Sequence, residues 1–387
     1  DILGYASIKD IVLENDSLKW KADSIDFKAQ ILDNQQRQLL LSSPIINASL
    51  TGKFNTTELP VVFTKFGDQY FPFSTFIGGS EVDDAVSPAQ TDSIKSDYIK
   101  VEIGVKDPTD LAHLFQIDLR KLDTASLSFT LDAPENLSDL KFDLPLLQYG
   151  DITVHQVKML ADNQGNQLKA QLRIDSIRLS ETMSIPSIEV DAKLNDNKST
   201  FSARIVEDST NYRFGIQGNI DGTGKTIYLN LEDPVYLNFE KWKVTQAAPL
   251  NISQFDSIPE IKLMSENQSL SIQGDMKNLA VAFEKFDINN ILQLVKFDST
   301  TFKGEINGDL AIGLEGNEAP INGDLSIDKI AINNLNVGDI KLKADKISDQ
   351  IKTENTGAEK SKLFPTDIGI VVNDFLTENF PDILSFD

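Results

Sequence analysis

The chain has 387 residues, among which 59 acidic residues outnumber 36 lysines and arginines and give a formal net charge of −23. This charge argues against nucleic-acid binding, which requires clustered basic side chains, and against adsorption to anionic lipid headgroups. Apolar residues make up 40% of the sequence, which is typical of a chain with a folded core. The absence of cysteine excludes disulfides and thiolate chemistry.

A membrane-spanning segment is not evident in the sequence. No apolar run approaches the roughly 18 residues that cross a bilayer as a helix. The opening stretch DILGYASIKD has neither a start methionine nor a signal-like apolar core. We therefore expect the chain to be an internal piece of a longer protein, with any membrane anchor outside it.

The first thirty residues carry apolar side chains two positions apart, in YASIKDIVLENDSLKWKADSIDFKA. A spacing of two is the period of a β-strand, in which successive side chains point to opposite faces. The pattern predicts a meander of short strands with one apolar and one polar face. The predicted apolar-face residues are Ile8, Ile11, Leu13, Leu18, Trp20, Ile25 and Phe27.

The next segment, TTELPVVFTKFGDQYF, shows helical spacing instead. Its apolar residues form one stripe of a short helix, with Thr57 as the N-cap. Thr109 and Asp287 are expected N-caps of two further short helices. We expect these helices to cover rims or edges of the sheet. The four predicted stripes are Leu59, Val62, Phe63 and Phe66; Leu111, Leu114 and Phe115; Ile288, Ile291, Leu292 and Val295; and Leu376, Phe380, Ile383 and Leu384.

The middle of the chain continues the strand pattern. DLKFDLPLLQYGDITVHQVKMLAD is a looser copy of the first meander, and QLKAQLRIDSIRLS, SIEVDAKL and TFSARIV also alternate. NIDGTGKT, at 219–226, has Asn219 where a phosphate-binding loop needs glycine, and it lies between two predicted strands. It is therefore expected to be a hairpin turn.

Near its end the chain repeats the opening pattern almost residue for residue, in INGDLSIDKIAINNLNVGDIKLKAD. Ala6 and Ile8 correspond there to Leu325 and Ile327. The alternation changes phase at Asp328-Lys329 and at Gly338-Asp339, where we expect hairpin turns. The predicted apolar-face residues of this copy are Leu325, Ile327, Ile330, Ile332, Val337, Ile340 and Leu342.

Together these elements predict an all-β fold, mainly an antiparallel meander, in the form of an elongated open trough of repeated short strands with a few short amphipathic helices. An irregular repeat of roughly 90 residues accounts for the spacing of the elements. We expect one repetitive domain over residues 1–387, with polar, mobile insertions at 78–97 and 348–362. The approximate repeats are 1–72, 98–162, 163–275, 276–345 and 364–387.

No motif points to catalysis or to a cofactor. The two histidines, His113 and His155, fall beside a helical stripe and in a strand, and neither belongs to a zinc or Ser-His-Asp motif. The acidic residues alternate with apolar ones, as on a solvated strand face, and form no calcium loop. We therefore expect a protein that is not an enzyme.

A glycine-rich strand pair from Gly304 to Ile312, the loop from Glu315 to Ala319, and the stretches INGDLSIDKIAINN and GDIKLKA form a pattern that resembles the TamB family of AsmA-like envelope proteins. LLLSSPIINASLTGKFNTTELPVVF and VYLNFEKWKV are similar to the same family. The resemblance covers nearly the whole chain. It does not extend to the family's amino-terminal membrane helix or its carboxy-terminal partner-binding end.

The resemblance implies an open β-taco in the periplasm, anchored in the inner membrane through a segment outside this chain. It implies transfer of phospholipid between the two membranes and a link to outer-membrane protein assembly, with a TamA- or BamA-type barrel as partner through parts outside this chain. The fourteen predicted apolar-face residues would then line a groove for phospholipid acyl chains.

Two other functions are compatible with the sequence. An extracytoplasmic β-sandwich scaffold or binding protein would carry no lipid, and its apolar faces would close on one another as a core. A β-solenoid carbohydrate enzyme would need an acid pair or an Asp/His cluster on one face, which the sequence does not show.

Overall fold

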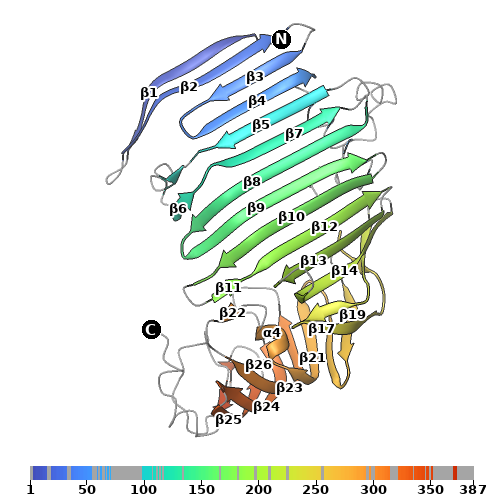
Figure 1. Ribbon diagram of the computed structural model, residues 1–387. Helices are drawn as coiled ribbons and strands as arrows, with labels where there is room; N and C mark the ends of the chain where they lie inside the picture. The colour runs from blue at the N-terminus through green and yellow to red at the C-terminus, as the bar shows by residue number, and fades with distance from the viewer. Residues whose placement is uncertain are drawn as a thin grey trace. The chain divides into compact units, whose positions relative to one another are not determined.

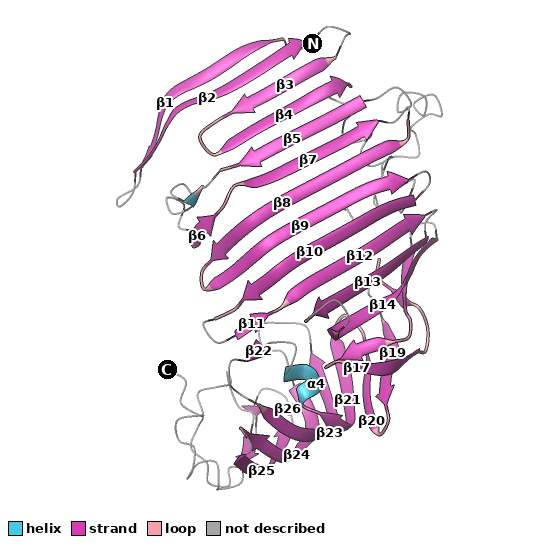
Figure 2. Ribbon diagram, viewed as in Figure 1, coloured by secondary structure: helices cyan, strands magenta, loops and turns pink. Residues whose placement is uncertain are grey.

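The computed structural model describes most of residues 3–54, five positions between 59 and 70, residues 98–351 apart from short internal gaps, and residues 369–372. Nearly all of these residues lie in antiparallel strands, so the fold is all-β, as the alternation predicts (Figure 2). The chain divides into two compact units. The first comprises residues 1–206 and 220–225, and the second comprises residues 207–219 and 226–387.

Several predicted features lie outside the described residues. These are the insertion at 78–97, most of that at 348–362, the final helical stripe, and single positions such as Leu18, Thr57 and Phe63. Gln350 and Ile351 of the second insertion are described and form a short strand.

The first unit is a meander in which each long strand pairs with the next long strand along the chain (Figure 1). Two short strands pair beside it, one with the strand 137–149 and one with the strand 167–178. The strands are β1 (Gly4–Glu14), β2 (Lys19–Ile31), β3 (Arg37–Ser42), β4 (Ile46–Lys53), β5 (Tyr98–Val105), β6 (Leu119–Leu122), β7 (Ala125–Asp132), β8 (Leu137–Tyr149), β9 (Ile152–Gln164), β10 (Gln167–Arg178), β11 (Met183–Ile185), β12 (Ser187–Asn195) and β13 (Lys198–Val206).

The second unit is also antiparallel. Its elements are β14 (Tyr212–Thr223, shared with the first unit), β15 (Thr226–Leu231), β16 (Val235–Leu237), β17 (Glu240–Gln246), β18 (Leu250–Asn251), β19 (Ile258–Ser265), β20 (Gln268–Gly274), β21 (Asn278–Asp287), α4 (Asn289–Leu292), β22 (Lys296–Phe297), β23 (Phe302–Gly313), β24 (Ile321–Ile332), β25 (Leu335–Ala344), β26 (Lys346–Ile347), β27 (Gln350–Ile351) and β28 (Gly369–Val372). The long strands pair in the order β17, β19, β20, β21, β23, β24, β25, β28.

A hydrophobic core stabilises this second unit. Trp242 and Phe286 are 1% and 0% exposed, and their ring centroids lie 5.6 Å apart. Val235, Leu263 and Ile306 complete the buried cluster. The core therefore gathers side chains from β16, β17, β19, β21 and β23 on one side of the sheet.

The strands are longer than the alternation of apolar residues indicates. The positions at which the alternation changes phase are irregularities within a strand and do not end it. β24 runs through Asp328-Lys329 and β25 runs through Gly338-Asp339, so the predicted hairpin turns are wrong. The register shifts between Ile327 and Ile330, and Lys329 has a positive φ of 56°. This is a β-bulge, in which one extra residue changes the apolar spacing from two to three, as a turn would. Ile327 and Ile330 consequently pack in one cluster.

The helical stripes are confirmed in part. Leu59, Val62 and Phe66 are helical, as predicted. The carboxylate of Asp287 accepts a hydrogen bond from the Asn289 N–H at 2.9 Å, but Asp287 is not the N-cap of α4. It ends β21, and the carbonyl of Ile288 accepts the first helical hydrogen bonds, so Ile288 holds the N-cap position. Phe115, however, lies in a turn and is 62% exposed, so it does not belong to a packed stripe. His155 lies in β9, as expected. Of the predicted turn at 219–226, residues 219–223 belong to β14 and Thr226 begins β15, and residues 224 and 225 lie outside the described residues.

Candidate functional site

The strand register of the first unit aligns apolar side chains across the sheet. Residues directly opposite one another in an antiparallel pair lie on the same face. Following these pairs from β1 to β13 yields a continuous line of eleven apolar residues, which we call row B. Row B consists of Ala6, Phe27, Leu41, Ala48, Ile103, Leu127, Phe142, Met159, Leu172, Val190 and Ala203.

Two parallel rows flank row B on the same face, two residues along each strand. Row A crosses β2 to β13, and row C is formed in three parts. Both rows are entirely apolar, so the face presents three adjacent apolar rows. Row A is Ala29, Leu39, Leu50, Val101, Phe129, Leu140, Ala161, Ala170, Ala192 and Phe201; row C is Ile8 and Ile25, then Ile46, Val105 and Ala125, then Leu144, Val157, Ile174, Ile188 and Ile205.

Row B is not covered by other parts of the described chain. None of its eleven residues is buried. Met159, near its middle, is 38% exposed, and Phe27 is 37% exposed. In row C, Ile8 is 63% exposed. Because neighbouring strands lie about 4.8 Å apart, row B forms an uncovered apolar line roughly 48 Å long.

A different part of the same face is covered. On the side of row A away from row B lies the set of paired residues that we call the covered row: Gly52, Ile99, Leu131, Ser138, Asn163, Leu168 and Leu194. Ile99 and Leu131 are fully buried here. They pack beneath the strap, which we define as the described residues Phe54, Leu59, Val62, Phe66 and Tyr70.

A buried polar network fixes the end of the strap to the sheet. The Asn163 Nδ2 donates to the Tyr70 hydroxyl at 2.8 Å, and that hydroxyl donates to the Asn136 Oδ1 at 3.3 Å. The Asn163 Oδ1 accepts from the Ser138 hydroxyl at 3.2 Å and from the Ser138 N–H. Burial raises the pKa of Tyr70, although the Asn163 hydrogen bond acts in the opposite direction. The strap is thus held by packing and by specific hydrogen bonds.

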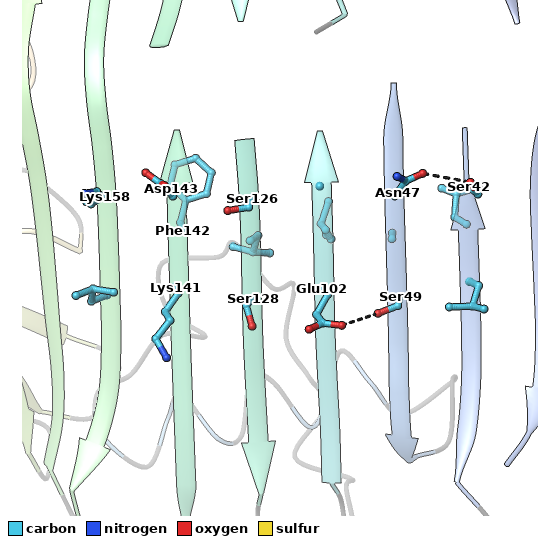
Figure 3. A pocket seen from close by; sticks show the side chains of 17 residues that line it. Ser42, Asn47, Ser49, Glu102, Ser126, Ser128, Lys141, Phe142, Asp143 and Lys158 are labelled. Atoms are coloured by element: carbon cyan, nitrogen blue, oxygen red, sulfur yellow. Dashed lines mark hydrogen bonds between the residues drawn. The ribbon is translucent and has the colours of Figure 1, made fainter. Parts of the chain in front are cut away.

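The opposite face of the first unit is polar and largely paired with itself. Asp191, for example, contacts Arg173 at 3.0 Å and Arg204 at 2.7 Å. A shallow hollow of about 780 Å³ lies on this polar face over β3 to β9 (Figure 3). Its lining combines polar side chains with the apolar residues Leu40 and Leu160 of the same face, and it also includes row B residues such as Phe142. The polar residues that Figure 3 labels are Ser42, Asn47, Ser49, Glu102, Ser126, Ser128, Lys141, Asp143 and Lys158.

The predicted apolar-face residues of the amino-terminal copy occupy one corner of the first unit. Ile8 and Ile25 pair in row C, and Phe27 belongs to row B. Beyond Asp10, whose φ is 55°, Ile11 lies opposite Ala22 and Leu13 lies opposite Trp20. Ile11 and Trp20 are half-buried, and Leu13 is exposed.

The residues of the carboxy-terminal copy lie in the second unit and are more enclosed. Ile330 and Val337 are buried, and Ile327, Ile332 and Ile340 pack against them. Leu325 packs against the Trp242 cluster, and Leu342 lies opposite Leu325 in the register. Apart from Leu18, which lies outside the described residues, the predicted residues are thus distributed over the two units.

The prediction of apolar-face residues missed the centre of the uncovered face, whose residues lie in the sequence between the amino-terminal and carboxy-terminal copies. Leu172 in β10 and Val190 in β12 were parts of predicted strands but not of the predicted site. The available signal was the alternation in QLKAQLRID, where Leu168, Ala170, Leu172 and Ile174 point to one face.

Comparison of the chain with protein-family models, curated proteins and solved structures found no match. Within the described part of the chain, no helix is long and apolar enough to cross a membrane. The same residues contain no group of three or more acidic, His or Cys side chains arranged to hold a metal ion.

Proposed function

We propose that the apolar face of the first unit binds lipid acyl chains and conducts them along row B. The observation that carries the proposal is that a line of eleven apolar side chains crosses eleven strands without one of them being buried. Large exposed apolar surfaces on folded proteins usually mark sites for lipid, ligand or protein.

The physical chemistry of acyl chains supports this use. Transfer of each methylene out of water stabilises it by about 0.8 kcal/mol, so a 16-carbon tail in water is disfavoured by on the order of 12 kcal/mol. A continuous apolar row removes much of that penalty at every position along the sheet. The row holds no polar cluster that would fix a ligand in one place, which suits movement along it.

The wider biological setting follows from the family resemblance. We propose a non-enzymatic periplasmic protein that transfers phospholipid between the inner and outer membranes and is linked to outer-membrane protein assembly. Its partner would be an outer-membrane barrel of the TamA or BamA type, bound through parts outside this chain.

A closed β-sandwich scaffold without lipid is the second candidate. The burial of Ile330 and Val337 in the second unit fits a closed core. In the first unit, the 38% exposure of Met159 argues against such a core, because an inward-facing residue of a sandwich would be buried.

Two neighbouring residues provide a matched test. Met159 lies in row B, and Leu160 lies on the polar face with a similar exposure of 45%. Met159→Glu should reduce binding of a fluorescent phosphatidylethanolamine by about tenfold or more, because a charge must be desolvated beneath the tail. Leu160→Glu should bind like the unmodified protein. Equal binding by all three proteins, or no lipid copurifying with the unmodified one in native mass spectrometry, would contradict the proposal.

A further inference from the structure

The open part of the apolar face has a limited width along the strands. On one side the strap covers Ile99 and Leu131 of the covered row. On the other side, the paired residues that follow row C in β8 to β10 are Leu146, His155 and Ser176, of which two are polar. Row B and most residues of rows A and C therefore form the open apolar area of this described part of the sheet. Ala29 of row A and Ala125 of row C are buried, and Leu50, Val101 and Phe129 of row A lie at the edge of the strap and pack against its cluster.

Three rows of side chains create two intervals between them. Adjacent rows are two residues apart along each strand, or about 6.8 Å. Each interval therefore accommodates one hydrocarbon chain, whose carbons would contact the flanking side chains at about 4 Å. Two acyl chains can lie side by side along the face, crossing the strands.

Without the strap, the face would gain a third interval. The covered row contributes the apolar residues Ile99 and Leu131 on one side, and Leu168 and Leu194 on the other side, of the polar pair Ser138 and Asn163. Val62 and Phe66 occupy the space above these apolar residues, and the Phe66 ring makes edge contact with Tyr70 at a centroid distance of 5.4 Å. The strap thus occupies the position that a further acyl chain would take.

We propose that Phe66 and Tyr70 are specificity-determining residues, because they hold the strap as a side wall that restricts the face to lipids with two acyl chains. This inference rests on the proposed lipid-binding function. Phe66 supplies the apolar contact with the covered row, and the Tyr70 hydroxyl, through Asn163, fixes the wall to β9.

Photo-crosslinking from two positions on one strand tests the wall. A photoreactive amino acid replaces either Val190 in row B or Leu194 in the covered row, both in β12. The probe is radiolabelled phosphatidylglycerol in mixed micelles. In the otherwise unmodified protein, the lipid should crosslink from position 190 and not from position 194. Phe66→Asp should raise crosslinking from position 194 by about tenfold, since a carboxylate cannot stay in the apolar cluster.

Two further measurements keep the test decisive. Tyr70→Phe retains the ring and should raise crosslinking from position 194 by about threefold, because it removes the hydroxyl that bonds to Asn163 and Asn136. If circular dichroism shows that Phe66→Asp does not fold, Tyr70→Phe takes its place in the test. The control Phe115→Asp, at an exposed phenylalanine, should change nothing. Cardiolipin, with four acyl chains, should compete with phosphatidylglycerol better in the two strap variants than in the unmodified protein.

The outcomes separate the two proposals. No crosslinking from position 190 in any protein overturns lipid binding and the wall together. Equal crosslinking from positions 190 and 194 in the unmodified protein leaves lipid binding in place and overturns the wall. Unchanged crosslinking from position 194 and unchanged cardiolipin competition in the strap variants also overturn the wall.

Discussion

Phe283 and Phe286 lie three positions apart in β21, yet their rings are in edge contact with centroids 5.4 Å apart. A regular strand would place them on opposite faces. The register shifts between them, and Lys285 has a positive φ of 47°. The Lys285 N–H donates to the Asn307 Oδ1 at 2.8 Å. The bulge therefore returns Phe286 to the apolar side, where it is fully buried.

The left-handed backbone at Lys285 leads to a first prediction. Lys285→Val should lower the free energy of unfolding by about 1–2 kcal/mol, because a β-branched residue tolerates this conformation poorly. Lys285→Gly should stay within about 0.5 kcal/mol of the unmodified protein, since glycine adopts positive φ freely and the site is exposed. Urea denaturation of the three proteins measures the difference. A valine variant as stable as the glycine variant would show that the bulge is absent.

β-Bulges of this kind show which features of the fold could be predicted from the sequence and which could not. The correspondence of Ile8 with Ile327 extends to the backbone, because Asp10 and Lys329 have nearly equal positive φ values of 55° and 56°. Alternation sufficed to predict strands and their two faces. It could not distinguish a bulge from a turn, since both change the apolar spacing in the same way.

The position of the strap on the sheet could not be predicted from the sequence either. The stripe of Val62 and Phe66 predicts a helix that needs an apolar partner. All four rows of the face are apolar at most strands, however, so the pattern does not select the covered row. That choice depends on the Tyr70–Asn163 hydrogen bond, which joins residues 93 positions apart.

A second prediction concerns the close approach of β4 and β5 in the covered row. A Cβ added at Gly52 would lie 1.9 Å from the Tyr98 carbonyl oxygen, whereas one added at Gly104 in β5 would meet nothing within 4 Å. Gly52→Ala should therefore destabilise the first unit by about 1–3 kcal/mol, and Gly104→Ala should have little effect. Thermal unfolding followed by circular dichroism compares the two. Equal melting temperatures would mean that the two strands do not approach as described.

A third prediction concerns acid stability of the β1–β2 pair. Hydrogen bonds from Ser24 and from Tyr5, each 2.5 Å long, lower the pKa of Asp26 from 3.8 to about 2. Between these two values the unfolded chain binds more protons than the folded one, so stability rises with pH from about 2 to 3.8. The stabilisation that Asp26 contributes is complete above pH 3.8 and is lost as the pH falls through about 2. Asp26→Asn should remove this dependence, and Tyr5→Phe should weaken it. Melting temperatures measured across this pH range would contradict the assignment if all three proteins showed the same slope.

A final prediction uses the opposite end of the pH scale to probe the strap. Tyr70→Phe removes the hydroxyl that bonds to Asn163 and Asn136, and should cost about 1–2 kcal/mol of stability near neutral pH. Because burial raises the pKa of Tyr70 in the folded state, the unfolded chain loses its proton first as the pH rises. The contribution of Tyr70 is therefore complete below the ordinary tyrosine pKa and declines above it. The stability difference between the two proteins should shrink at alkaline pH, as measured by urea denaturation. A difference that stays constant would show that the Tyr70 hydroxyl is not buried between the strap and the sheet.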